Sequence, residues 1–368
     1  MGSLVDSSIF IFHSNNVVIF LLVYIDDILV TGNNKASISS LIYALQQEFP
    51  LKDLGELTFF LGIEVARTPT QLHLQQTKYI TNLLHKNGMV GAKPYSAPCV
   101  PGSQLSSSAG DPLLDPSIYR QVVGALQYCT LTRPDIAYSV NQLCQHLHSP
   151  TTLHWIVVKR VLRYLKGTPN HGLHFSKGPH CLAAFCDADW VGNPDDCRST
   201  TGFGVLFGLC LISWCAKKQP IVSRFSTEAE YRALAMLTTE LYWLSMLFKE
   251  LHVPLPTVPK IWCDSLGALA LASNPICHAQ TKHNEVDYHF IREKVLNKDI
   301  SVHYLSTHDQ LADIFTKGLP SSRFLFFCDK LMVFGSPISL RGAISKYTMI
   351  PAHGPDPQHQ SRDPTIVV

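Results

Sequence analysis

The sequence predicts a mixed α/β protein built from more than one domain. The chain has 368 residues, more than a typical single domain contains. Short apolar runs rich in β-branched residues alternate with segments of helical periodicity along most of its length. Residues 94–117 are rich in Pro, Ser and Gly and lack both periodicities, so they divide the chain as a linker would.

Composition excludes several classes of protein. The 30 Lys and Arg nearly balance the 28 Asp and Glu, unlike a polybasic protein, and a hydrophobic content of 46% is too high for a disordered chain. The longest apolar run, residues 17–25, is far shorter than the roughly 20 residues that a bilayer requires. The 11 Cys form no C-x-x-C pair, which argues against a zinc module or a disulfide framework. Because the first residues also lack the basic start of a signal peptide, we expect an intracellular protein, in the cytoplasm or nucleus, without membrane contact.

Strands and one helix are predicted before the linker, and helices after it. The strand-like runs are residues 9–12, 17–25, 28–31 and 57–65, and the helical segment is 35–48. Helices are predicted at 117–131 and 153–166. The second of these has an apolar stripe with Lys159, Arg163 and Lys166 beside it. These three residues form either a solvated helix face or a surface that follows phosphates.

The remaining elements alternate as in an α/β layer. Strands are predicted at 181–186, 204–207, 211–214, 261–263 and 301–305, and helices at 226–251, after 263, at 283–295 and at 310–315. The whole chain is therefore divided into a first domain over 1–93, the linker 94–117, a helical segment over 118–180, an α/β domain over 181–320 and a partly loose tail over 321–368.

Asp26 and Asp27 form a first acidic constellation, between two apolar runs. Adjacent carboxylates disfavour each other's ionisation, and hard divalent cations bind carboxylate oxygens. The pair is therefore either a metal-binding element for phosphoryl transfer or an Asp-rich hairpin turn. The close flanking by Ile25 and Ile28 makes a routine turn less natural, but the sequence around the pair leaves both interpretations open.

Four further acids stand at predicted strand ends and helix starts: Asp187, Glu230, Asp264 and Asp313. Such positions can converge at one edge of a sheet, where two Mg²⁺ (or Mn²⁺) ions would neutralise the four carboxylates. Each acid also has a structural explanation, namely a capping box of Thr227 with Glu230, a helix cap by Asp264-Ser265, a helix-start charge at Asp313, and surface acids such as Asp189, Asp195 and Asp196 around Asp187. All four together, in this order, are harder to explain by chance than any one of them.

Many short motifs follow one another in a fixed order. Tyr24-Ile25-Asp26-Asp27 with Thr31-Gly32 is followed by residues 53–57, 60–65, 76–80, 119–128, 132–137 and 162–168, and then by residues 187–190, 198–202, 226–231, 263–265 and 310–317. Together these motifs resemble the Pol polyprotein of copia-type LTR retrotransposons, in which they belong to the reverse transcriptase, the connection and the ribonuclease H (RNase H). The resemblance covers roughly residues 5–333.

The resemblance implies a truncated reverse-transcriptase palm, a helical, thumb-like connection and an RNase H-like mixed sheet with flanking helices. It implies that Asp26 and Asp27 bind the polymerase metal ions. It further implies that Asp187, Glu230, Asp264 and Asp313 are the catalytic ligands of two Mg²⁺ or Mn²⁺ ions, with Glu230 rather than Glu228 as the ligand. The implied partners are an RNA–DNA hybrid and upstream Pol segments.

The sequence also departs from the family pattern. The palm needs a third metal-binding Asp and nucleotide-holding fingers, and only 23 residues precede Tyr24, so we expect no independent polymerase activity. Cys197 stands where the family has Arg, and Phe225 where it has Ser, just before the helix that carries Glu230. Integrase and protease motifs are absent.

Two functions are therefore considered. The first is a metal-dependent endonuclease that cuts the RNA strand of RNA–DNA hybrids, with the backbone held by Lys159, Arg163, Lys166, Lys217, Lys218 and Arg224. The second is a non-catalytic transposon remnant that at most binds nucleic acid. An integrase-like nuclease would present Asp, Asp and then Glu, and here Glu comes second. The sequence does not predict the oligomeric state.

Overall fold

The chain forms two compact units. The computed structural model describes residues 2–14, 16–273, 285–335 and 365–367. Residues 1–66 with 336–368 form the first unit and residues 67–335 the second. The sequence-based boundaries at 93 and 180 do not coincide with this division, because the segments on both sides of each boundary pack into one unit. None of the described helices is long and apolar enough to cross a bilayer.

The first unit is a small sheet covered by one helix. Its strands are β1 (Ile9–Ser14), β2 (Val17–Tyr24), β3 (Asp27–Gly32), β15 (Thr365–Val367) and β4 (Lys52–Asp53), in the order β1-β2-β3-β15-β4. The helix α1 (Lys35–Glu48) begins where the Asn34 side chain accepts a hydrogen bond from the Ser37 amide. Ile38 and Ile42 of α1 pack against Ile19 and Val30 of the sheet.

The strand predicted over residues 57–65 is two short strands. Leu61 and Gly62 both have positive φ angles, of 46° and 75°. This backbone reverses the chain, so β5 (Phe59–Phe60) and β6 (Ile63–Arg67) pair as an antiparallel hairpin. The prediction of a single strand was wrong because apolar alternation does not reveal a turn of only two residues.

The second unit contains a mixed sheet with the order β11-β10-β9-β12-β13. Its strands are β9 (Leu182–Asp189), β10 (Thr200–Phe207), β11 (Cys210–Lys218), β12 (Lys260–Cys263) and β13 (Ser301–Tyr304). The three strands β9, β10 and β11 are antiparallel, whereas β12 runs parallel to both β9 and β13. The central strand β9 therefore joins an antiparallel half to a parallel half, the RNase H-like arrangement that the sequence predicts.

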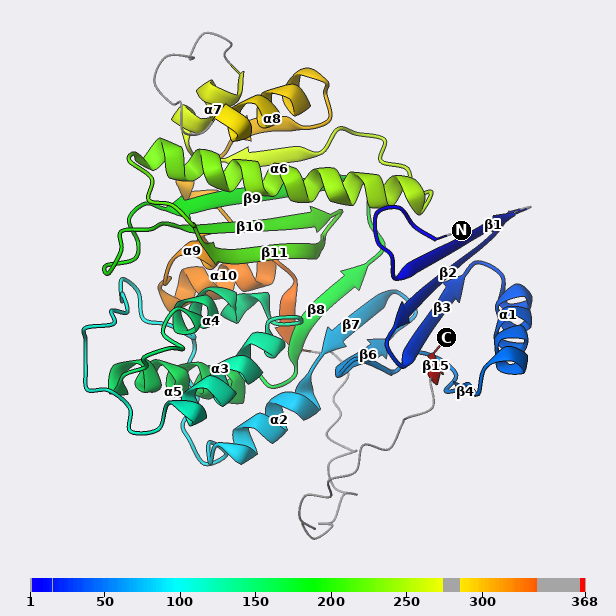
Figure 1. Ribbon diagram of the computed structural model, residues 1–368, viewed down its shortest axis with the longest axis horizontal. Helices are drawn as coiled ribbons and strands as arrows, with labels where there is room; N and C mark the ends of the chain where they lie inside the picture. Colours follow the sequence, from blue (N-terminus) through cyan, green and yellow to red (C-terminus); the bar gives the residue numbers. More distant parts are fainter. Residues whose placement is uncertain (1, 15, 274–284, 336–364, 368) are drawn as a thin grey trace. The chain divides into compact units, whose positions relative to one another are not determined.

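Helices cover both faces of this sheet. The long helix α6 (Ser226–Glu250) lies along one face, and α7 (Leu266–Ser273) and α8 (Glu285–Leu296) pack beside it (Figure 1). Phe203 and Val205 point into the core shared with α6. The glycines between and beside them, Gly202 and Gly204, face the short helix α9 (Asp313–Thr316) instead. The predicted helix over 283–295 is found in α8, although residues 283 and 284 lie outside the described residues.

A second core in the same unit joins helices from before and after the mixed sheet. The helices are α2 (Thr77–Lys86), α3 (Pro116–Cys129), α4 (Ala137–Cys144), α5 (Thr152–Gly167) and α10 (Ser321–Lys330), and β7 (Gln71–Gln75), β8 (His171–Ser176) and β14 (Val333–Gly335) form strands beside them. Phe324, Phe327 and Val333 are buried in this core. Residues 321–335, predicted to belong to a partly loose tail, are thus part of a packed domain, while residues 336–364 lie outside the described residues.

An ion pair lies at the centre of this second core. Arg133 and Asp135 are 2.7 Å apart, and neither side chain is exposed. The Tyr164 hydroxyl donates to Asp135 at 2.5 Å, and Arg133 also donates to the carbonyl oxygen and the hydroxyl of Thr168. Burial opposes ionisation of Asp135, but the Arg133 charge outweighs it and lowers the pKa of this carboxyl. The motif over residues 132–137 therefore holds α5 to the segment before α4.

The predicted linker is also packed. Residues 94–115 contain no helix, as expected, yet Ala97 is only 2% exposed. The Tyr95 ring contacts the guanidinium group of Arg163, 3.7 Å from the ring centroid. Ser106 and the Ser107 amide donate hydrogen bonds to Asp195, in the loop between β9 and β10. This segment therefore lies against the domains that it was expected only to connect.

Candidate active site

Asp187 occupies the central strand near its end. It lies in β9 opposite Gly202 of β10, and it is 2% exposed. Thr316 donates a hydrogen bond from its hydroxyl to Asp187, and Lys317 Nζ lies 3.3 Å from the same carboxylate oxygen. The side chain of Asp189 points to the same face of the strand, since side chains alternate along a strand. Asp187 is thus a buried acid with an alcohol and an ammonium group beside it.

The start of α6 separates the roles of two neighbouring glutamates. The helix begins after Phe225, and the Glu228 carboxylate accepts a hydrogen bond from the Arg224 amide at 2.9 Å. Glu228 also forms an ion pair with Arg232 one turn later, at 2.9 Å. Glu228 therefore stabilises the helix start, and the capping box of Thr227 with Glu230 does not form. Glu230, one turn into the helix, faces the sheet.

Asp264 follows β12 directly, and its neighbour performs the capping. The Ser265 hydroxyl accepts a hydrogen bond from the Ala268 amide at 3.2 Å, so Ser265 and not Asp264 caps α7. Oδ1 of Asp264 and Oε2 of Glu230 are buried and have no hydrogen-bond partner among the described residues. Three possible ligand atoms lie within 4.8 Å of one another here, one each from Glu230, Cys263 and Asp264. Buried carboxylate oxygens without donors are costly, unless a cation or a proton satisfies them.

Asp313 begins α9 and is held by two cations. Lys317 Nζ lies 2.7 Å from one carboxylate oxygen of Asp313, and the Arg323 guanidinium lies 2.7 Å from the other. Asp313 is 1% exposed. Lys317 therefore bridges Asp313 and Asp187, and its charge offsets part of their mutual repulsion.

Burial and mutual repulsion raise the pKa values of three acids at this site. Burial raises the pKa of Glu230 to about 10, and the nearby Asp187 and Asp264 act in the same direction. Burial and the Asp187 charge raise the pKa of Asp313 to about 6, although Lys317 and Arg323 oppose this. Burial, with a further contribution from Asp187, raises the pKa of Asp189 to about 7. A divalent cation would reverse these shifts by favouring the ionised carboxylates.

The four predicted acids therefore meet at one end of the mixed sheet. Glu230 interacts electrostatically with both Asp187 and Asp264, and Asp313 interacts with Asp187. Carboxylate oxygens are the ligands that Mg²⁺ and Mn²⁺ take in proteins. The orphaned oxygens of Glu230 and Asp264 fit such an ion, as does the raised pKa of Glu230.

Two buried amides hold the acid-bearing helices to the sheet. Gln219 Nε2 donates to the Thr201 hydroxyl at 3.0 Å and to the Ala229 carbonyl of α6 at 2.9 Å. Gln310 Nε2 donates to the Cys186 carbonyl at 2.8 Å, just before Asp187. The sequence does not single out Gln219, because an amide has no charge or spacing that signals such a role.

Gly202 lets α9 approach the sheet closely. A Cβ atom at this position would lie 2.5 Å from Cγ2 of Thr316 and 2.8 Å from Cβ of Phe315. Because Thr316 and Asp313 belong to the same short helix, this close approach brings Asp313 to Asp187.

Asp26 and Asp27 lie in the other compact unit, in a hairpin turn. Tyr24 pairs with Asp27 across the hairpin, so Ile25 and Asp26 form the turn between β2 and β3. Ile25 has a positive φ of 48° and is 81% exposed. The expectation that the flanking isoleucines make a turn less natural is wrong, because Ile25 points into solvent. A turn does not conflict with metal binding, since it leaves Asp26 exposed.

The predicted basic residues fall into two groups. Arg163 donates to the Lys93 carbonyl at 2.6 Å, and Lys166 donates to the Ala92 carbonyl at 2.7 Å, so both hold the segment before the linker. Lys159, on the same helix, is exposed, and its ammonium lies 5.8 Å from the centre of the Trp155 ring. Of the three basic residues predicted on α5, Lys159 is thus the one most open to a ligand.

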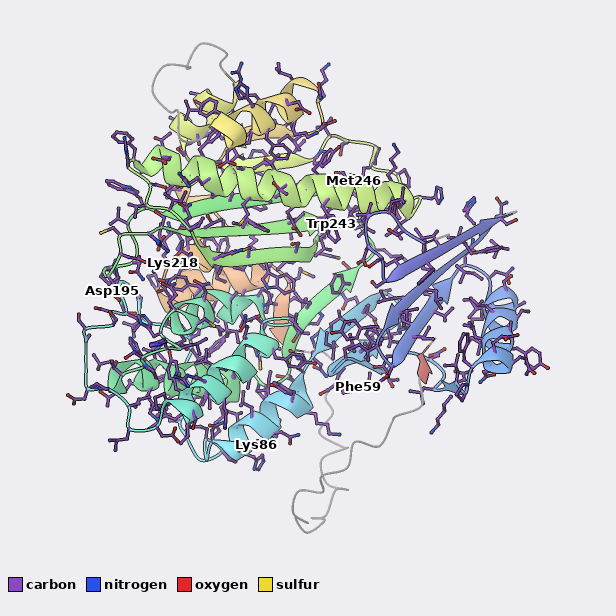
Figure 2. The ribbon with its side chains drawn as sticks, viewed as in Figure 1. Phe59, Lys86, Asp195, Lys218, Trp243 and Met246 are labelled. Carbon is purple, nitrogen blue, oxygen red and sulfur yellow. The ribbon has the colours of Figure 1, made fainter. Side chains whose placement is uncertain are left out.

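The second basic group lies at the end of the sheet where the acids meet. In the strand register, Lys218 of β11 lies opposite Thr200 of β10, and Thr200 lies opposite Asp189 of β9. Lys217 lies opposite Thr201. Figure 2 shows Lys218 and Asp195 at one end of the mixed sheet, whereas Trp243, late in α6, lies towards the other end. Lys217 and Arg224 are exposed, and Lys218 forms an ion pair with Asp196 at 2.7 Å.

Sequence reasoning missed the part played by Lys317. Its spacing of four residues from Asp313 was the available signal, although such a pair is common on any helix. Asp189 was also interpreted as a surface acid, but it is largely buried and accepts a hydrogen bond from the Thr200 amide.

Comparison with known proteins identifies relatives along most of the chain. Residues 4–101 match the family model for reverse transcriptase (RNA-dependent DNA polymerase). The chain is 46% identical, over 92% of its length, to a retrovirus-related Pol polyprotein from transposon RE1 of Arabidopsis thaliana, and it spans 23% of that relative. An uncharacterized mitochondrial protein of the same plant is 50% identical, over 61% of this chain and 94% of its own length. Among solved structures, LC11-RNase H1 from compost is similar over 38% of this chain and 94% of its own, with 13% identity and a TM-score of 0.30.

Proposed function

Because the chain belongs to the Pol polyproteins of copia-type retrotransposons, we propose that its mixed-sheet domain cleaves the RNA strand of RNA–DNA hybrids. The observation that carries this proposal is the meeting of four acids from four separate elements. Two of their buried oxygens, on Glu230 and Asp264, have no hydrogen-bond partner among the described residues. A purely structural acid cluster would be expected to satisfy such atoms.

Asp187, Glu230, Asp264 and Asp313 would hold two Mg²⁺ or Mn²⁺ ions. Such ions, when bound, stabilise the charge on the attacking and leaving oxygens of a phosphodiester. The chain itself supplies the arrangement: Gln219 and Gln310 fix the helices of Glu230 and Asp313 against the sheet. The burial of these carboxylates keeps water from competing for their oxygens.

The basic residues at the end of the sheet support a nucleic-acid substrate. Lys217, Lys218 and Arg224 would contact the hybrid backbone, with Lys159 further away on α5. Arg163 and Lys166 contribute less, because they already bind the carbonyl oxygens of residues 92 and 93. An A-form shape and the 2′-hydroxyl would distinguish the RNA strand.

Asp26 and Asp27 are proposed as polymerase metal ligands. They lie in the region that matches the reverse-transcriptase model. We propose that they act together with other segments of Pol.

The proposal is tested by incubating the full chain with a labelled RNA–DNA hybrid and Mg²⁺ or Mn²⁺. Wild type is compared with Asp264→Asn and with a control, Asp299→Asn, which changes an acid of the same domain that pairs with Lys294. We expect cleavage by wild type and Asp299→Asn and loss of cleavage in Asp264→Asn, because a metal ligand is removed.

Two results would contradict the proposal. Equal cleavage by wild type and Asp264→Asn would show that the cleavage does not depend on Asp264 and comes from another activity. Salt-dependent binding of the hybrid by wild type without any cleavage would favour the alternative, a non-catalytic transposon remnant.

A further inference from the structure

The two halves of the acid cluster differ in how their charge is balanced. Asp187 and Asp313 share the ammonium of Lys317, which lies 3.3 Å from one carboxylate and 2.7 Å from the other. In the other half, the buried oxygens of Glu230 and Asp264 have no hydrogen-bond partner within the described part of the chain. One half thus carries its own cation, whereas the other still needs one.

Lys317 is placed so that it can leave. Its side chain is 41% exposed, and its flexible four-carbon stem lets the ammonium turn into solvent when another cation takes its place. Asp313 would keep its orientation without Lys317, because Arg323 holds its second oxygen at 2.7 Å. Asp187 likewise keeps the hydrogen bond from Thr316.

We propose that Lys317 is a built-in counter-ion that makes the metal site bind its two cations unequally. The inference rests on the proposed function, because it assumes that the four acids bind divalent ions. A first ion would bind between the buried oxygens of Glu230 and Asp264, which have no hydrogen-bond partner among the described residues. A second ion would reach Asp187 and Asp313 only by displacing Lys317, because two positive charges cannot share these oxygens without strong repulsion.

A second role follows from the same geometry. Without metal, Lys317 offsets the repulsion between two buried carboxylates, so the domain can fold before it binds ions. Lys317 is therefore a positioning residue, and not a group that contacts the phosphodiester.

The test is a Mn²⁺ titration of the full chain. Binding is measured by calorimetry and by the electron paramagnetic resonance signal of free Mn²⁺. Wild type is compared with Lys317→Met, which keeps the length of the side chain but removes the charge. The matched control is Lys294→Met, which removes an ammonium from Glu293 and Asp299 on the far side of α6. Thermal unfolding with EDTA and with Mn²⁺ is measured on the same samples.

For wild type we expect a strong and a weak binding step. In Lys317→Met the weak step strengthens about tenfold or more, because a competing unit charge is gone. In EDTA the same variant melts at a lower temperature than wild type. When Mn²⁺ is added, its melting temperature rises by more than that of wild type, so the difference between the two becomes smaller. Lys294→Met changes stability equally with and without Mn²⁺ and leaves both binding steps unchanged.

Lys317→Arg provides a second test if Lys317→Met does not fold without metal. A guanidinium binds carboxylates through a planar fork and is harder to displace, so the weak step weakens further in this variant. A weak step that does not respond to either substitution, or a single identical step in all variants, overturns the inference.

The two proposals fail in different ways. A wild type that binds no Mn²⁺ and cleaves no hybrid rejects the metal-dependent function and this inference with it. A wild type that binds Mn²⁺ and cleaves hybrid, beside a Lys317→Met variant with an unchanged weak step, rejects the role of Lys317 alone.

Discussion

Gln310 donates a hydrogen bond from its side-chain amide to the carbonyl oxygen of Cys186, at 2.8 Å, although 124 residues separate them. The Gln310 oxygen also accepts a hydrogen bond from the Ala312 amide at 3.2 Å. A single buried side chain thus joins the central strand, one residue before Asp187, to the segment that leads into Asp313.

Gln310→Ala is therefore expected to affect both stability and metal binding. It leaves the Cys186 carbonyl and the Ala312 amide without their partner, at a cost of about 1–3 kcal/mol in the free energy of unfolding. Because α9 is then held less firmly, the weaker Mn²⁺ step should also lose affinity. Urea unfolding and a Mn²⁺ titration measure the two effects. As a control, Gln46→Ala removes an exposed contact of 3.4 Å and should change neither. Equal behaviour of the two variants would contradict this role.

Gly202→Ala should push α9 away from the sheet. The added methyl group meets Thr316 and Phe315 at distances that require the helix to move. We expect a loss of about 1–3 kcal/mol in stability and weaker Mn²⁺ binding. Gly124→Ala is the matched control, since nothing lies within 4 Å of an added methyl group there, and Ala in α3 should stabilise by about 0.5–1 kcal/mol. An unchanged Mn²⁺ affinity in Gly202→Ala would show that Asp313 does not depend on this close approach.

Breaking the buried ion pair of Arg133 and Asp135 should lower the stability of the helical core. Arg133→Met leaves the Asp135 carboxylate buried without its cation, at a cost of about 3–5 kcal/mol. The double variant Arg133→Met/Asp135→Leu should be less destabilised than the single variant, because no buried charge remains. Lys218→Met, which breaks a partly exposed pair with Asp196, should stay within about 1 kcal/mol of wild type. Chemical denaturation compares all three. A double variant less stable than Arg133→Met would contradict the argument.

Stability without metal should fall as the pH rises. The pKa of Glu230 is about 10 in the folded protein and 4.5 in an exposed glutamate, so the folded state binds more protons than the unfolded state between these values. The stability linked to this proton is fully present below the lower value and is lost progressively as the pH rises toward the higher one. Asp189 and Asp313 act in the same direction, but only up to their own folded-state pKa values, which are about 7 and about 6.

The pH effect just above neutrality is therefore assigned to Glu230, because the buried cysteine thiols, whose pKa values are also raised, contribute only as the pH approaches 9. Melting temperatures in EDTA should fall between about pH 7 and about pH 8 in wild type, and much less in Glu230→Gln. Saturating Mg²⁺ should reduce the slope in wild type, because the ion replaces the proton on Glu230. Glu228→Gln is the control, since Glu228 stabilises the helix start and should lower stability similarly at both pH values. A Glu230→Gln variant with the wild-type slope would reject the assignment.

The positions of the acids and the elements that carry them follow from local patterns in the sequence. The predicted ranges for α3, α5 and α6 and for the strands of the mixed sheet agree with the structure to within a few residues at most of their ends. Such elements are readable because hydrophobic periodicity is a local property. The same reasoning identified Asp187, Glu230, Asp264 and Asp313 as a group.

The charge balance and the support of these acids depend on contacts that form only in the folded chain. Lys317 bridges two carboxylates, Gln310 joins α9 to β9, and Arg163 binds the segment before the linker instead of remaining free. Apart from the pair of Lys317 with Asp313, these contacts join residues far apart in the chain, and so does the hydrogen bond of Thr316 to Asp187, across 129 positions. Local sequence patterns do not encode such pairs, because strand pairing and helix packing bring them together only when the whole core forms.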